Sequence, residues 1–228
     1  MKRNILRGVL LGVLCVASVA MAQEEGQASY GRGQGWSVLS GQTMGQGGTA
    51  FVGQVGWPGI SLGLLHGATP KFDIGGRFTF NYGREGIVTS VVPGLKLQAW
   101  VRLMLLQSSR VNVGLSFAPG PFFYFYNNGT DVGLTLPIAL TVGIPVGSAV
   151  MLNLGMDIPF YVIFGTGGGP VFPILFGGGL EYFISRDLAV NFNVRMGPSI
   201  FPNDDFIRYR GRQARFTMEA LFGLAYKF

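Results

Sequence analysis

The chain has 228 residues, of which 48% are hydrophobic, 13% are aromatic and only 12% are charged. Soluble domains average about 25% charged residues, so this composition points to a lipid environment. The formal net charge of +6 is too small to indicate nucleic-acid binding.

The first 22 residues are typical of a secretory signal peptide. MKRNILR is basic, a short apolar run follows it, and Ala20-Met21-Ala22 matches a signal-peptidase site. Removal of this segment would leave 14 of the 17 basic residues against 11 acidic ones, a net charge of +3. The lone cysteine, Cys15, would leave with it, so we expect an exported chain without disulfides.

Two long stretches, 132–156 and 158–180, carry no charge. Each exceeds the roughly 20 residues that a membrane helix needs. From 132 to 144, however, large apolar residues occupy the even positions and mostly small ones the odd positions, a two-residue period that is typical of strands. Five prolines within these stretches also count against helices. We therefore predict strands.

The same alternation recurs at 71–82, 187–196 and 216–228. Strands cross a bilayer only when every backbone group is paired, so the sheet must close into a cylinder with its apolar face toward lipid. A soluble β-sandwich also alternates, but it needs a charged outer face, and here the other face is mainly Gly, Ala, Thr and Asn. We predict an all-β, antiparallel, up-and-down transmembrane β-barrel.

The pattern predicts ten strands. They lie near 36–44, 50–65, 71–84, 94–106, 110–126, 131–145, 149–163, 170–185, 187–200 and 212–228. The first is the weakest; if it does not span the membrane and another weak segment merges or splits, the count becomes eight. Trp57-Pro58-Gly59 is a candidate kink in the second strand.

Connections between the predicted strands fall into two alternating sets. The periplasmic set is 66–70, 107–109, 146–148 and 185–187. The outer set is 45–49, 85–93, 127–130, 164–169 and 201–211.

The signal peptide, the alternating strands and an apolar closing strand together resemble a small bacterial outer-membrane β-barrel protein. In that closing strand, every second residue is apolar, ending on Phe222, Leu224, Tyr226 and Phe228. The resemblance implies an outer-membrane location, contact with membrane lipids, and recognition of this strand by the barrel-assembly machinery. It covers essentially the whole mature chain and identifies an architecture. We predict a signal peptide over 1–22, a flexible segment over 23–34, and a monomeric barrel over 35–228.

Candidate catalytic groups are scarce. The single histidine, His66, falls in a predicted periplasmic turn, whereas outer-membrane proteases and lipid A hydrolases resemble one another in placing a histidine near the outer rim. The sequence has no Cys or His cluster for a metal. We therefore expect no enzyme, no metal and no cofactor.

Several charged residues occupy positions that the alternation turns toward the lumen. They are Asp73, Arg77, Lys96, Arg102, Glu181, Arg195, Arg215 and Glu219. Because unpaired charges in a narrow interior are costly, we expect cross-strand ion pairs or water to satisfy them, with Glu219 and Glu181 as candidate partners of Arg195. The alternative interpretation is a selectivity lining.

The predicted outer loop carries Arg208, Arg210 and Arg212. Arginines there suit the phosphates of lipopolysaccharide, although a solvated loop explains them equally well.

These features favour a non-enzymatic barrel with a structural or surface-interaction role. The alternative is a narrow channel or transporter for a small or lipidic solute, since about ten strands leave little bore. An outer-membrane enzyme ranks third. The sequence names neither a solute nor a partner protein.

Overall fold

The computed structural model describes residues 35–86, 91–127, 129–164, 168–200 and 214–228. Within these ranges the chain forms fourteen strand segments in one antiparallel sheet. They are β1 (Thr49–Trp57), β2 (Gly59–Thr69), β3 (Phe72–Asn81), β4 (Gly94–Gln107), β5 (Asn112–Phe117), β6 (Gly120–Tyr126), β7 (Gly129–Thr135), β8 (Ile138–Val146), β9 (Val150–Ile158), β10 (Tyr161–Phe164), β11 (Pro170–Pro173), β12 (Leu175–Phe183), β13 (Leu188–Ile200) and β14 (Ala214–Lys227). Nowhere in the described residues is there a helix of the length and apolarity needed to cross a membrane.

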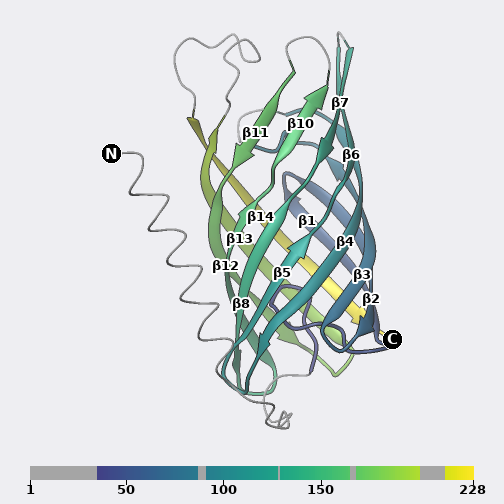
Figure 1. Ribbon diagram of the computed structural model, residues 1–228, viewed down its shortest axis with the longest axis vertical. Coiled ribbons are helices and arrows are strands. Elements are labelled where there is room, and N and C mark those ends of the chain that lie inside the picture. The colour runs from purple at the N-terminus through teal and green to yellow at the C-terminus, as the bar shows by residue number, and fades with distance from the viewer. Residues whose placement is uncertain (1–34, 87–90, 128, 165–167, 201–213) are drawn as a thin grey trace.

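The fourteen segments make ten strands, because four strands are each interrupted by one or two residues. Phe117 pairs with Ile138 and Gly120 with Thr135, so the register between β5–β6 and β7–β8 is the same on both sides of the break. Pro119 and Pro137 lie in this break and lack the N–H that a ladder needs. The register is likewise the same on both sides of the break between β9 and β10 and of the break between β11 and β12. Since β1 pairs with β14, the sheet closes into a ten-stranded barrel (Figure 1).

The predicted strand count is confirmed, although two of the predicted strands are wrong. Residues 36–44 form no strand. The segment predicted as one strand over 50–65 is instead a hairpin, in which Thr49 pairs with His66 and the chain reverses at Trp57-Pro58-Gly59. Compared with the prediction, the strand at 36–44 is absent and the segment around 50–65 contributes two strands in place of one. The total stays at ten, and the alternative of eight strands is wrong.

The hairpin also changes which end of the barrel some segments occupy. Gly48 accepts a backbone hydrogen bond from Gly67, and Thr49 exchanges two with Phe228, so residues 45–49 lie beside Phe228, which directly follows β14. The prediction that 45–49 is an outer loop is wrong. At the opposite end β3 and β13 end and β4 and β14 begin, and these two pairs of strands have the most residues between them, 82–93 and 201–213. Because barrels of this kind have short periplasmic turns and longer outer loops, the end that holds Phe228 is the periplasmic end.

The outer face of the barrel is an apolar surface. Along β14 and at the residue after it, Phe222, Leu224, Tyr226 and Phe228 are exposed by 52%, 50%, 52% and 67%. Alternate residues of the other strands, such as Leu64 on β2 and Phe192 on β13, are exposed in the same way. An uncharged, hydrogen-bonded wall with this much exposed apolar area is stable in hydrocarbon rather than in water. The polar residues of the chain are consequently concentrated inside.

Candidate functional site

The segment before β1 fills the periplasmic end of the lumen. Figure 1 shows it in purple, lying across the lower part of the barrel. Residues 36–38 and 40–44 are buried there, and we call residues 35–44 the plug. The plug bends at residues 38–41, is buried at nearly every position, and pairs with none of the described strands. The sequence-based prediction placed its first and weakest wall strand here, and that strand is wrong.

Charged residues of the wall bind the main chain of the plug. The Arg102 guanidinium donates hydrogen bonds to the carbonyl oxygens of Ser37 at 2.7 Å, of Ser40 at 2.8 Å and of Gln42. Glu181 accepts from the Ser37 hydroxyl and from the Val38 N–H.

Asp73 holds the other end of the plug. Its carboxylate accepts a hydrogen bond from the Met44 N–H at 3.0 Å and lies 3.8 Å from Arg102. Asp73 and Glu181 are both fully buried. The carbonyls and N–H groups of an irregular segment are thereby satisfied by charged partners, which make stronger hydrogen bonds than neutral ones.

The plug also fits closely against the wall. A Cβ added at Gly41 would lie 2.2 Å from the backbone nitrogen of Gly114 on β5, and one added at Gly114 would lie 2.5 Å from the Gly41 Cα. No side chain fits at either position. Trp36 packs edge-on against Phe183, with 5.3 Å between ring centroids, and its indole N–H donates to the Arg186 carbonyl. The plug is therefore seated by shape as well as by charge.

The outer part of the lumen is narrowed by aromatic residues. The rings of Phe122, Tyr124 and Tyr161 are buried against one another. The Tyr161 hydroxyl donates to the carbonyl oxygen of Glu85, and Asn81 donates to the Tyr124 hydroxyl. This outer constriction ties the segment that follows β3 into the barrel.

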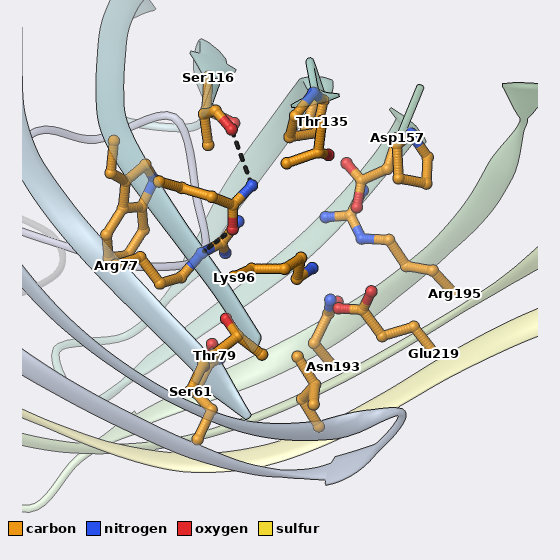
Figure 2. A pocket seen from close by; sticks show the side chains of 18 of the residues that line it. Ser61, Arg77, Thr79, Lys96, Ser116, Thr135, Asp157, Asn193, Arg195 and Glu219 are labelled. Carbon is orange, nitrogen blue, oxygen red and sulfur yellow. Dashed lines mark hydrogen bonds and ion pairs between the residues drawn. The ribbon is translucent and has the colours of Figure 1, made fainter. Parts of the chain in front are cut away.

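Between the plug and the outer constriction lies a cavity of about 160 Å³, which we call the chamber. Val38, Leu39 and Ser40 of the plug contribute to its wall at one end, and Glu85 at the other. The ionisable side chains that line it are Arg77, Glu85, Lys96, Arg102, Asp157, Arg195 and Glu219. Figure 2 shows the Lys96 side chain extending between Arg77 on one side and Arg195 with Glu219 on the other.

Two ion pairs account for four of these groups. Lys96 binds Glu85, and Arg195 binds Asp157 with 2.8 Å between nitrogen and oxygen. Arg77 donates from Nε to the Gln98 amide oxygen at 3.3 Å and lies over the Trp100 ring. Glu219 stands opposite Arg195 in the β13–β14 register. Within the described ranges, no hydrogen bond or ion pair reaches its carboxylate.

The structure places the eight charges named from the sequence in three groups. Asp73, Arg102 and Glu181 bind the plug, while Arg77, Lys96, Arg195 and Glu219 line the chamber. Arg215 faces Ser199 across the β13–β14 ladder and is half-buried.

The partners differ from those expected. The pairs Arg195–Glu219 and Arg195–Glu181 were expected, but the Arg195 guanidinium reaches Asp157 on β9 instead. Sequence reasoning missed Asp157, although it is the only charged residue between two uncharged stretches. It also occupies an odd-numbered position, as the inward residues Met151 and Asn153 of β9 do. Glu85 was missed because it was assigned to an outer loop.

His66 lies on β2 close to the periplasmic end, exposed, where Nδ1 is 2.8 Å from the Thr49 hydroxyl. In the part of the chain that the structure describes, no three residues among His, Cys, Asp and Glu gather to hold a metal. Arg208, Arg210 and Arg212 lie outside the described residues.

No protein-family model matches the sequence, and the search of curated proteins likewise gives no match. Two solved structures are similar in fold. The outer membrane protease OmpT of Escherichia coli is 8% identical, with a TM-score of 0.43 over 79% of this chain and 96% of that one. OmpT, an outer membrane protein of Vibrio cholerae, is 13% identical, with a TM-score of 0.37 over 79% of this chain and 61% of that one.

The expectation that this chain is a non-enzymatic structural or surface-interaction protein is contradicted, because one of these similar barrels is a protease. We therefore withdraw it. At such low identity the likeness concerns the fold alone, and it transfers no catalytic residue to this chain. The closed ten-stranded sheet, its apolar outer face and its charged lumen make this chain a β-barrel of the bacterial outer membrane.

Proposed function

We propose that a small polar solute crosses the outer membrane through the lumen of this protein. The plug closes this path at rest. The observation that carries the proposal is the polar chamber of about 160 Å³ ending on a segment that is not part of the wall. Sites for drug-sized ligands measure roughly 300–1,000 Å³, so the solute is smaller than these.

The way in which the plug is bound supports a closing element that moves. The barrel closes through β1 and β14 without any contribution from residues 35–44, so displacing them leaves the ladder intact. Buried charges contribute little net stability compared with apolar packing. When the plug leaves, Arg102, Asp73 and Glu181 would become hydrated in an open lumen, which lowers the cost of opening.

The test compares two matched glycine replacements in planar bilayers. Gly41→Ala places a Cβ against the backbone of Gly114 and should unseat the plug. Gly53→Ala is the control, since a Cβ there meets only ordinary contacts at 3.7 Å or more. We expect the wild-type protein and the control to stay mostly closed, and Gly41→Ala to raise the open-channel conductance at least several-fold.

Two outcomes would overturn the proposal. One is an unchanged conductance in Gly41→Ala while proteolysis shows residues 35–44 to be released. The other is a solute recovered chemically altered after incubation with the wild-type protein, which would assign the chamber to catalysis.

Other expectations from the sequence also stand as proposals. We infer that residues 1–22 are cleaved on export, which N-terminal sequencing of outer-membrane material would test by finding Gln23 first. We further propose that the protein is a monomer and that the assembly machinery recognises Phe222, Leu224, Tyr226 and Phe228.

We also propose that Arg208, Arg210 and Arg212 contact lipopolysaccharide. Replacing all three with serine and measuring co-purified lipid tests this contact.

A further inference from the structure

Counting only described residues, the charges of the chamber leave one group of each sign without an ion-pair partner. Apart from Arg102, which binds the plug, three cations and three acids line the cavity. Lys96 with Glu85 and Arg195 with Asp157 account for two of each. Arg77 and Glu219 remain, and both face the cavity.

Among the described residues, no cation lies within ion-pair distance of Glu219, although Lys96 and Arg77 are near enough to attract its carboxylate. Its cross-strand neighbour Arg195 turns its guanidinium away, to Asp157 and over Gly155. The next residue of β14 that faces inward is Leu221, which cannot donate a hydrogen bond. A carboxylate in a narrow lumen needs donors, so water or a solute must supply them.

Arg77 is held in position by groups that leave its far edge open. Nε binds the Gln98 oxygen, and Gln98 is itself fixed by its amide donating to the Ala118 carbonyl at 2.7 Å. The guanidinium lies 5.4 Å from the centroid of Trp100. Among the described residues, none accepts a hydrogen bond from its two terminal nitrogens. A guanidinium fixed in this way is preorganised for a carboxylate, which it binds with two parallel hydrogen bonds.

Two hydroxyl groups lie on the strands between these charges. Ser61 on β2 and Thr79 on β3 are direct cross-strand partners, and both line the chamber. Neither hydroxyl has a side-chain or main-chain partner in the described part of the chain. They can therefore bind a polar solute that extends from one charge toward the other.

We propose that the chamber binds a small zwitterion of the α-amino-acid class, with its carboxylate on Arg77 and its ammonium group on Glu219. Such a solute has no net charge and satisfies both unpaired groups at once, whereas an anion or a cation satisfies one and leaves the other. This inference rests on the proposed function, since it names the class of solute that the lumen takes up.

The test measures binding to the full-length protein in lipid nanodiscs by calorimetry, with three probes of similar size. L-serine carries both charges, glycerate lacks the ammonium group, and ethanolamine lacks the carboxylate. We expect the wild-type protein to bind L-serine about tenfold or more tightly than either analogue, because each charge-assisted hydrogen bond contributes more than a neutral one.

Two variants then assign each charge. Arg77→Gln should weaken L-serine and glycerate about tenfold and leave ethanolamine unchanged, while Glu219→Gln should weaken L-serine and ethanolamine and leave glycerate unchanged. Arg110→Gln and Asp187→Asn remove charges from exposed periplasmic turns and should change nothing. A general collapse of the lumen would instead weaken all three probes alike in both variants, which would overturn the assignment.

The inference and the proposed function fail separately. L-serine binding no tighter than that of its analogues, in a protein whose Gly41→Ala variant conducts, would overturn the zwitterion and leave the passage standing. Selective L-serine binding with no conductance in that variant would support the zwitterion and overturn the passage.

Discussion

At the periplasmic end of the lumen, Arg102, Asp73 and Glu181 are buried and bind the main chain of the plug. In the chamber above them, Lys96 pairs with Glu85 of the segment after β3, Arg195 pairs with Asp157, and Arg77 and Glu219 face open space. The plugged end and the chamber are lined by the same types of charged residue, and one continuous sheet surrounds both. The difference lies in what fills the lumen, which is protein at one level and solvent or solute at the other.

This comparison explains why a narrow barrel keeps so many charges. Ion pairs buried in protein are a weak source of stability, so stability alone does not account for them. Around the plug they fix the position of a segment that has no ladder of its own. Around the chamber some charges have no ion-pair partner among the described residues and face the cavity, which is the arrangement that a binding site needs.

The largest effect that we expect follows from Arg102→Met. The change removes three hydrogen bonds to the plug and leaves the buried carboxylate of Asp73 without its ion-pair partner. Breaking a buried pair costs about 3–5 kcal/mol, and release of the plug should limit the loss by admitting water. Urea unfolding in lipid vesicles, together with proteolysis of residues 35–44, measures both effects. Unchanged stability with a protected plug would contradict the role given to Arg102.

Trp36→Ala should separate the plug from the wall. A buried tryptophan replaced by alanine costs about 3 kcal/mol or more, but here the cost falls on seating the plug, since Trp36 belongs to no strand. We expect hydrogen exchange of residues 35–44 to accelerate roughly a hundredfold, while β13 and β14 remain as protected as in the wild type. Exchange that accelerates equally throughout the barrel would show the plug to be part of one cooperative unit.

The wall could be predicted from the sequence, because burial of one face repeats every second residue. That signal placed β3, β4, β13 and β14 within a few residues of their observed bounds. It could not separate a wall strand from the plug, since Trp36, Val38 and Met44 are apolar residues that become buried inside the lumen without joining the ladder. It also could not tell a kink from a hairpin at Trp57-Pro58-Gly59, as both use proline and glycine.

The partners of the charges were beyond prediction for a different reason. Alternation tells which side chains point inward, but a guanidinium in a narrow lumen reaches across strands. Arg195 therefore passes over β12 to Asp157 on β9, although Glu219 is its neighbour in the ladder. Glu181 binds a plug whose place in the lumen the sequence did not reveal.

Lys96→Met sharpens the comparison from the side of the chamber. The change leaves Glu85 without its cation, as Arg102→Met does for Asp73, but Glu85 borders the cavity and keeps access to water. We therefore expect a smaller loss in the free energy of unfolding than in Arg102→Met, because these side chains are 8% and 14% exposed, against 6% and 0% for Arg102 and Asp73, and no hydrogen bond to the plug is removed. A loss equal to that of Arg102→Met would show that the two levels of the lumen do not differ.

Thr79→Val should have the smallest effect on stability and still affect binding. The replacement keeps the shape of the side chain and removes a hydroxyl that has no partner in the described protein. The free energy of unfolding should change by less than about 0.5 kcal/mol. The affinity for L-serine should fall a few-fold, because a hydrogen bond between neutral groups contributes about 1 kcal/mol. A variant that loses stability and keeps its affinity would mean that the hydroxyl serves the wall, and that the chamber is no more open to solutes than the plugged end.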